Sequence, residues 1–88
     1  MQVLYQKRFL KDLSLVPHRS RKEIENFVFE VLPDAATIAE LSRFEKMTGY
    51  EYCFKARFGS YRIGAYYKDN VLELRRVLHR KEIYRYFP

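Results

Sequence analysis

The chain has 88 residues, the length of one domain, so we expect residues 1–88 to fold as a single unit. Its only cysteine, Cys53, excludes an intramolecular disulfide and a cysteine-based metal site, and such cysteine usage is typical of a reducing cytoplasm. The formal net charge of +6 favours a polyanionic partner and resides in the second half, because residues 51–88 carry 9 Lys/Arg against 4 Asp/Glu. No apolar run approaches the roughly 20 residues of a membrane span, and the N-terminus lacks a signal-peptide pattern, so we expect a cytoplasmic protein.

The first part of the chain predicts one strand and two helices. Alternation around Val3 and Tyr5 indicates a short strand. Apolar residues at helical spacing follow, and Pro17 ends this first helix. The run Ser20-Arg21-Lys22-Glu23 has the pattern of a capping box, so we expect the second helix to start there, with His18 in a loop without function. The apolar stripe of the second helix ends at Pro33 and comprises Ile24, Phe27, Val28, Val31 and Leu32.

The second part predicts an antiparallel sheet. Residues 34–49 suit either a short irregular helix or a connector with buried anchors. From residue 50 the period is two, with tight turns at Gly59-Ser60 and Asp69-Asn70, a third strand over 71–78 and a short helical tail over 80–87. The element order β-α-α-β-β-β-tail defines an α+β domain, in which a small antiparallel sheet packs against an N-terminal helical hairpin.

Three cations share one face of the predicted hairpin. A two-residue turn at Gly59-Ser60 places Arg57 opposite Arg62, and Lys55 opposite Gly64. Like charges directly across a ladder destabilise a sheet unless an anion lies between them. Any one of these cations is ordinary on a solvated sheet face. The three together, beside a glycine that leaves room for a ligand, predict a phosphate site.

The tail adds groups that can transfer protons or stack on bases. The imidazole of His79 can transfer protons, and Tyr84 and Tyr86 can stack on bases or donate a proton. Alternatively, Ile83, Phe87 and one of these tyrosines simply bury against the sheet.

The third predicted strand contains a register problem. Strict alternation puts Arg76 on the apolar face with Leu72, Leu74 and Leu78. A β-bulge at Arg75-Arg76 would correct this and could aim one arginine at the phosphate site.

Two segments resemble the RelE branch of the RelE/ParE toxin superfamily. They are Phe54-Lys55-Ala56-Arg57-Phe58-Gly59-Ser60-Tyr61-Arg62-Ile63 and His79-Arg80-Lys81-Glu82-Ile83-Tyr84-Arg85, and the element order matches over nearly the whole chain. The resemblance implies a small sheet backed by an N-terminal helical hairpin. It also implies an endoribonuclease that cuts mRNA in the ribosomal A site and is neutralised by a cognate antitoxin.

The resemblance also implies roles for particular residues. The paired strand lysines of the family correspond to Cys53 and Lys55, so only the second is present here. The phosphate-binding arginine corresponds to Arg62, and the late arginine and tail tyrosine correspond to Arg80 and Tyr84. We therefore predict catalytic roles for Lys55, Arg62, His79, Arg80 and Tyr84, and RNA contacts by Arg57, Arg75, Lys81, Arg85 and Tyr86.

RNA cleavage by its own 2′-OH needs a base, an acid and cations for the phosphorane charge. Lys55 or His79 is the expected base and Tyr84 or His79 the expected acid, since arginine stays protonated. We expect no cofactor and no metal. Two alternatives remain: a ParE-like, non-enzymatic inhibitor of DNA gyrase on the same fold, and an RNA-binding module without catalysis.

Overall fold

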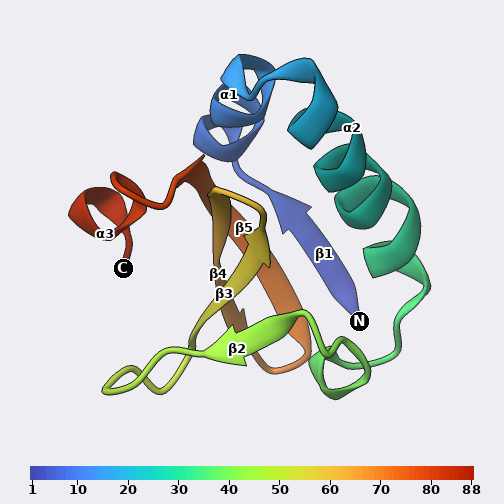
Figure 1. Ribbon diagram of the computed structural model, residues 1–88. Coiled ribbons are helices and arrows are strands. Elements are labelled where there is room, and N and C mark those ends of the chain that lie inside the picture. The colour runs from blue at the N-terminus through green and yellow to red at the C-terminus, as the bar shows by residue number, and fades with distance from the viewer.

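The computed structural model describes residues 1–88 and contains a five-stranded sheet in the order β1-β5-β4-β3-β2 (Figure 1). The helices and strands, in chain order, are β1 (Gln2–Tyr5), α1 (Lys7–Leu15), α2 (His18–Asn26), β2 (Phe44–Lys46), β3 (Cys53–Phe58), β4 (Tyr61–Lys68), β5 (Val71–His79) and α3 (Ile83–Tyr86). The predicted α+β class, the helical hairpin and the helical tail are confirmed. No helix is long and apolar enough to cross a membrane.

The sheet is mixed rather than purely antiparallel. β1 pairs in parallel with β5, with Gln2 opposite Val71 and Tyr5 opposite Leu74. The α1–α2 hairpin carries the chain across the sheet to its far edge, from which three antiparallel connections bring the last strand back beside the first (Figure 1). A parallel pair needs such a long crossover, which alternation within single strands does not reveal.

The second helix starts earlier than the sequence predicted. It begins at His18, so this residue lies in the first helical turn and not in a loop. The N–H of Arg21 donates to the carbonyl of Pro17 at 2.9 Å, and no side chain caps the helix, so the expected capping box at Ser20 is wrong. Pro17 is the N-cap residue, and its carbonyl accepts the first hydrogen bond of the helix. The helical path continues through a wider π-helical turn, Phe27–Val31, and a 3-10 turn, Leu32–Asp34, which includes Pro33.

Residues 34–49 form a connector with buried anchors, the second of the two expectations. A 3-10 turn at Ile38–Glu40 leads into β2, and the side chains of Leu41 and Met47 are buried. β2 pairs with β3 in antiparallel fashion and forms the edge of the sheet opposite β1, a strand the sequence did not predict.

Both predicted hairpins and the bulge are confirmed. Arg57 lies opposite Arg62 and Lys55 opposite Gly64. Asp69 and Asn70 have φ values of 52° and 60°, as a type I′ turn requires. On β5, Arg76 pairs with Gly64 and Leu74 with Ala65, so one extra residue, Arg75, is inserted between them. The bulge returns Val77 to the buried face of the sheet.

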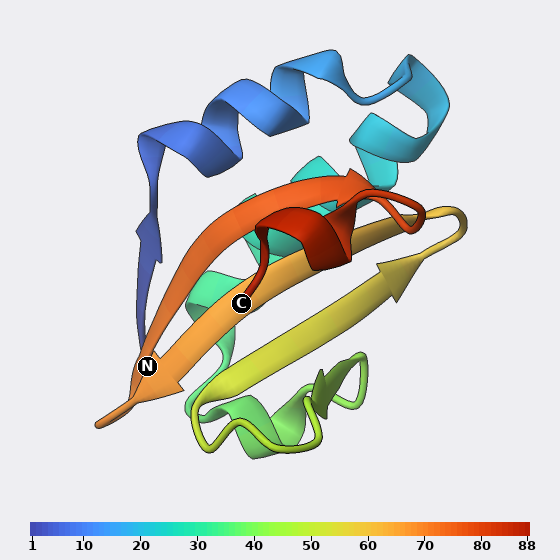
Figure 2. The ribbon, with the colours of Figure 1, turned by 90° about the vertical axis from the view of Figure 1, so that its left-hand side faces the viewer.

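Hydrophobic side chains pack on both faces of the sheet. The main core lies between the sheet and the α1–α2 hairpin, and it includes Phe9, Ile24, Leu32, Ile63 and Leu74. On the opposite face, Met47, Cys53, Ile83 and Phe87 form a second group, which we call the tail cluster. Figure 2 shows α3 lying against the face of the sheet that α2 does not cover. The short tail therefore has its own anchoring site beside the basic hairpin.

Candidate active site

The α3 face of the β3–β4 hairpin carries the predicted cations. Arg57 and Arg62 stand directly opposite each other, and Lys55 is on the same face. Only charged side chains line the small hollow there: Arg43, Glu45, Lys55, Arg57 and Arg62. No carboxylate forms an ion pair with Lys55, Arg57 or Arg62, since the three ion pairs of the chain involve other cations. This part of the surface is therefore positive and open to an anion.

The turn of the hairpin fixes Arg62. One terminal nitrogen of its guanidinium donates to the carbonyls of Gly59 and Tyr61, at 2.7 and 2.9 Å. Burial and the positive charges of Arg57 and Arg80 lower the pKa of Arg62, and Tyr84 partly offsets this. Burial and the neighbouring positive charges act against the charge of Arg62, and a bound anion would offset them.

The tail brings two more predicted residues to the same place. The backbone N–H of Arg80 donates to the carbonyl of Ser60 at 2.7 Å, which ties the start of the tail to the hairpin turn. The Lys55 ammonium lies 5.7 Å from the centre of the Tyr84 ring, and Tyr84 is 54% exposed. We call Lys55, Arg57, Arg62, Arg80 and Tyr84 the phosphate cluster.

Gly64 has a different role from the predicted one. A Cβ at this position would lie 2.5 Å from the ring of Phe87, which is buried against the glycine. The room above Gly64 is thus filled by the tail of the chain and not left for a ligand. Burial of Ile83 and Phe87 is confirmed, whereas Tyr84 and Tyr86 are both exposed, so neither tyrosine is a core residue.

Cys53 occupies the position at which the resemblance implies a second strand lysine. Its side chain is buried in the tail cluster, where it packs with Ile83 and Phe87 beneath α3. An apolar side chain at this position therefore supports the tail. Lys55 remains as the single lysine of β3 at the site.

His79 is separated from the phosphate cluster. It pairs with Tyr61, whose ring packs against the main core, and the two rings meet edge to face at 5.5 Å. His79 also lines a hollow with Leu15 and Val16 of α1. Paired residues share a face of the sheet, so His79 faces the helical hairpin while the phosphate cluster faces α3. The geometry gives no support to the predicted proton transfer by His79.

The two arginines of the bulge are held by carboxylates. Arg75 forms an ion pair with Glu73. Arg76 donates two hydrogen bonds to Asp12 of α1, at 2.7 and 3.1 Å, and these bonds raise the pKa of Arg76. The Arg76 guanidinium also lies 5.0 Å from the centre of the Tyr86 ring. The bulge therefore does not aim either arginine at the phosphate cluster, and Tyr86 contacts Arg76 instead.

The remaining residues are on the surface around the site. Lys81 and Arg85 are exposed, and their side chains form no ion pair. Sequence reasoning missed Arg43, which donates to the carbonyl of Arg57 at 2.8 Å and lies 4.2 Å from the centre of the Phe58 ring. It also missed Glu45, opposite Lys55 on β2. Only the β2–β3 pairing, which alternation did not predict, brings these two residues to the site.

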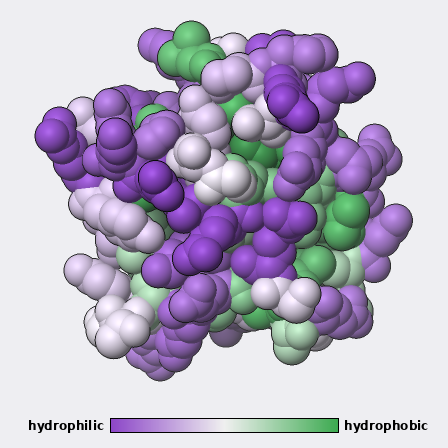
Figure 3. Space-filling model, in the orientation of Figure 1, coloured by the Kyte–Doolittle hydropathy of each residue, from purple (hydrophilic) through white to green (hydrophobic).

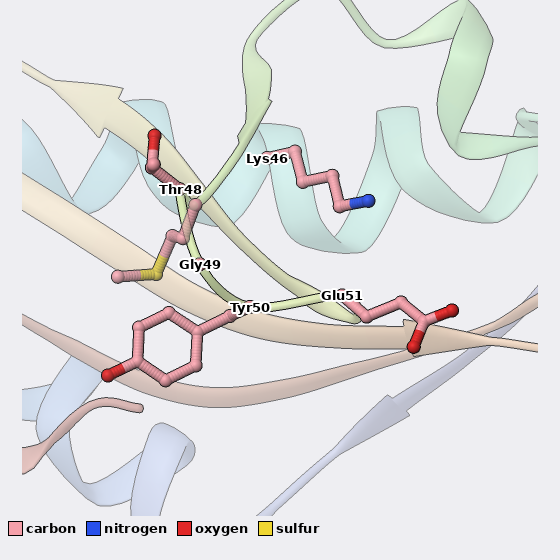
Figure 4. Close-up of a pocket in the computed structure, with 6 residues that line it drawn as sticks. Lys46, Thr48, Gly49, Tyr50 and Glu51 are labelled. Atoms are coloured by element: carbon pink, nitrogen blue, oxygen red, sulfur yellow. The ribbon is translucent and has the colours of Figure 1, made fainter.

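The largest hollow of the surface belongs to the β2–β3 loop and is distinct from the phosphate cluster. Figure 4 shows Lys46 and Glu51 pointing to one side of this loop and Tyr50 to the other. Side chains do not converge there as they do at the hairpin. Hydrophilic residues cover most of the face seen in Figure 3, and the hydrophobic surface is divided into small patches. No three His, Cys, Asp or Glu side chains are grouped as metal ligands would be.

A mixed sheet, an N-terminal helical hairpin and a basic hairpin closed by a short tail define the fold of RelE-type toxins. No family model matches the chain. The toxin RelE3 of Methanocaldococcus jannaschii is 40% identical over 89 aligned residues, which span 100% of both chains. A chain of the RelB–RelE antitoxin–toxin complex from Methanococcus jannaschii has a TM-score of 0.81 and 38% identity, covering 97% of this chain and 99% of that one.

A free-state mutant of the Escherichia coli toxin RelE shares the fold, with a TM-score of 0.61 and 22% identity over 86% of this chain and 79% of that one. The full-length identity to RelE3 settles the family: the chain belongs to the RelE toxins. These are mRNA-cleaving endoribonucleases of type II toxin–antitoxin systems.

Proposed function

We propose that the phosphate cluster is the active site with which this toxin cleaves mRNA in the ribosomal A site. The observation that carries the proposal is the convergence of four cations that form no ion pair, although Glu45 lies opposite one of them: Lys55, Arg57, Arg62 and Arg80. Unpaired like charges across a hairpin destabilise the fold, and a bound phosphate would offset that cost. Single-stranded RNA presents such phosphates together with bases that can stack on the exposed ring of Tyr84.

The arginines bind and stabilise the reacting phosphate in this scheme. Arg62, held by the hairpin turn, and Arg57 opposite it donate to the non-bridging oxygens, and Arg80 approaches from the tail. Negative charge on these oxygens grows as the phosphorane forms, so donors that are already in place stabilise the transition state most. Arginine suits this role because it remains charged.

Two side chains of the cluster can move protons. With the Lys55 side chain as the neutral amine, the 2′-oxygen attacks phosphorus while its proton passes to that amine, and the bond from phosphorus to the 5′-oxygen breaks as Tyr84 donates a proton to that oxygen. The products are a 2′,3′-cyclic phosphate and a 5′-hydroxyl, and no electrons are exchanged. Lys55 and Tyr84 are neighbours at 5.7 Å, whereas His79 is on the other face of the sheet.

A cognate antitoxin is the second part of the proposal. Chains that share this fold occur in RelB–RelE complexes from Methanococcus jannaschii and Pyrococcus horikoshii. Another is in the RelBE2 toxin–antitoxin complex from Mycobacterium tuberculosis. With a net charge of +6, this chain would favour an acidic partner that covers the phosphate cluster or the helical hairpin. Toxin and antitoxin would meet in the cytoplasm, where translating ribosomes are.

The test uses translating ribosomes programmed with a defined mRNA. The wild-type chain should cut in the A-site codon, and Arg62→Ala and Tyr84→Phe should lose cleavage more than ribosome binding. His79→Ala should keep cleavage within a few-fold. Absence of any cut, together with gyrase-dependent DNA damage in cells, would replace the proposal by the ParE-like alternative. Wild-type growth arrest by Tyr84→Phe and His79→Ala without cleavage would favour a non-catalytic RNA-binding module.

A further inference from the structure

A row of aromatic and cationic side chains lies at the end of the sheet away from the Gly59-Ser60 turn. The rings of Tyr52 and Tyr66 are 5.5 Å apart between centroids and inclined by 48°. The guanidinium carbon of Arg75 lies 4.5 Å from the centre of the Tyr66 ring, and the Lys68 ammonium lies 5.1 Å from that of Tyr52. We call Tyr52, Tyr66, Lys68 and Arg75 the stacking row.

Arg75 is presented in this row as a flat surface and not as a free charge. Its guanidinium is paired with Glu73, so it contributes little net charge for binding a phosphate. The same pairing holds the guanidinium against the Tyr66 ring, while the side chain remains 39% exposed. Nucleobases stack on both aromatic rings and arginine planes. Tyr52, Tyr66 and Arg75 therefore form a contiguous row of tilted rings ending in a guanidinium, and a base can be added on the exposed side of Arg75.

The stacking row and the phosphate cluster occupy the same face of the sheet. Tyr66 and Arg62 belong to β4 and are four residues apart, so their side chains point the same way. At about 3.3 Å per residue the two positions are roughly 13 Å apart along the strand, which lies within the span of a short oligonucleotide. Phe87, packed on Gly64 between them, separates the two sites.

We propose that the stacking row binds an unpaired base of the mRNA that flanks the cleaved phosphodiester, which rests on the proposed function. The Arg75 plane would stack on the base, Tyr66 would hold that plane in place, and Lys68 would lie near the phosphate of the base. RNA fits better than an apolar protein segment, because the exposed aliphatic and phenylalanine side chains lie on other elements: Leu4, Leu10, Leu15, Phe29 and Val31. The row thus provides a second anchor for the mRNA strand besides the reacting phosphate.

The experiment measures stacking on an mRNA that cannot be cleaved. Ribosomes are programmed with mRNAs that carry a 2′-O-methyl group at the cleavage position and 2-aminopurine at one flanking position at a time. Stacking on the row should quench the 2-aminopurine fluorescence at one of these positions when the wild-type chain binds. Tyr66→Ala should abolish the quenching and Tyr66→Phe, which keeps the ring, should retain it.

The same variants are then tested on cleavable mRNA. Stacking one base on an aromatic side chain changes affinity by about fivefold to a hundredfold. Tyr66→Ala should therefore raise the half-saturating toxin concentration by about tenfold and leave the maximal rate within about threefold. Arg75→Lys, which keeps the charge but loses the plane, should act in the same direction even where Tyr66→Ala folds poorly. Tyr50→Ala, at an exposed tyrosine of the β2–β3 loop, is the matched control and should change neither measurement.

Three results would overturn the inference that the stacking row binds a base. If no flanking position is quenched, or if Tyr66→Ala and Tyr66→Phe quench alike, the inference is overturned. It is also overturned if Tyr66→Ala weakens antitoxin binding alone, because the row would then be a protein contact. Failure of the proposed function looks different, since the wild-type chain would then leave cleavable mRNA intact whether or not a base is quenched.

Discussion

The sheet carries two pairs of arginines whose surroundings differ. Arg57 and Arg62 face each other across the β3–β4 hairpin, and no carboxylate forms an ion pair with either. Arg75 and Arg76 are neighbours on the bulge of β5, and each has its own carboxylate, Glu73 and Asp12. The comparison teaches that partner carboxylates, and not the arginines themselves, separate the cations that hold the fold from those left for a ligand.

The carboxylate of Asp12 pairs with Arg76 and also accepts a hydrogen bond from the backbone of β5. This carboxylate is 8% exposed, accepts two hydrogen bonds from Arg76 and takes a third, at 3.2 Å, from the backbone N–H of Val77. β1 pairs with β5 only as far as Leu74, so this N–H lies beyond the end of the parallel pairing. Asp12 therefore satisfies the strand edge and the arginine together, whereas the hairpin arginines are left without a comparable partner.

The largest expected effect comes from removing this carboxylate. Asp12→Ala would leave the Arg76 charge and the Val77 N–H without a partner in a mostly buried place, and we expect a loss of about 3–5 kcal/mol in the free energy of unfolding. Urea denaturation measures it. The double variant Asp12→Ala/Arg76→Met should recover part of the loss, because no unpaired charge remains. A loss below about 1 kcal/mol for the single variant would show that water readily replaces Asp12.

The hairpin pair should respond in the opposite way. Arg62→Ala removes a donor that is held in place for the phosphorane oxygens, so we expect a fall of about 10²–10³ in the cleavage rate. The free energy of unfolding should change by no more than about 1 kcal/mol, because two hydrogen bonds to the turn are lost while the repulsion of Arg57 is relieved. Single-turnover cleavage on programmed ribosomes and urea denaturation measure the two quantities. Arg62→Lys should restore only part of the rate, because lysine lacks the planar fork. A large loss of stability with normal cleavage would reverse the assignment.

How much the sequence predicted depends on how far apart the interacting residues lie. The Gly59-Ser60 turn and the alternation of β3 and β4 placed Arg57 opposite Arg62, because a two-residue hairpin sets its own register. The misplaced Arg76 predicted the bulge for the same local reason. The capping box failed locally as well, since the helix begins at His18, two residues before Ser20.

Contacts between distant segments could not be predicted in this way. Asp12 and Arg76 are 64 positions apart, and nothing in either segment identifies the other. Phe87 and Gly64 meet only after the tail folds back over the sheet, so the glycine was assigned to a ligand. His79 was grouped with Arg80 because they are adjacent, yet His79 ends β5 on the face of the helical hairpin, whereas Arg80 begins the turn that follows and is tied to Ser60.

The contact of Phe87 with Gly64 gives the next prediction. Gly64→Ala places a methyl group against the Phe87 ring and should cost about 1–3 kcal/mol of unfolding free energy through overpacking. Cleavage should fall too, because the displaced tail carries Tyr84 and Arg80. In a Phe87→Leu background the penalty of Gly64→Ala should shrink, since the smaller side chain leaves room. Thermal unfolding and single-turnover cleavage of the four proteins check this. Equal penalties in both backgrounds would mean that the strand, and not the tail, resists the methyl group.

The smallest expected effect concerns the repulsion between Arg57 and Arg62, which distinguishes this pair of arginines from Arg75 and Arg76. Arg57→Gln removes one of two like charges that face each other, so we expect the free energy of unfolding to rise by about 0.2–1 kcal/mol at low salt. The gain should shrink in 1 M salt, where the screening length falls to about 3 Å. Arg75→Gln, the matched control, should give no gain, because it removes a cation that Glu73 already neutralises.

Binding of inorganic pyrophosphate tests the same repulsion between Arg57 and Arg62. It should raise the unfolding temperature of the wild-type chain more than that of Arg57→Gln, because the phosphate offsets a repulsion that the variant no longer has. A loss of stability on Arg57→Gln would contradict this reasoning, since the aliphatic part of Arg57 would then matter more than its charge. A gain together with slower cleavage would show that the hairpin keeps an unfavourable pair of charges because the scissile phosphate needs both.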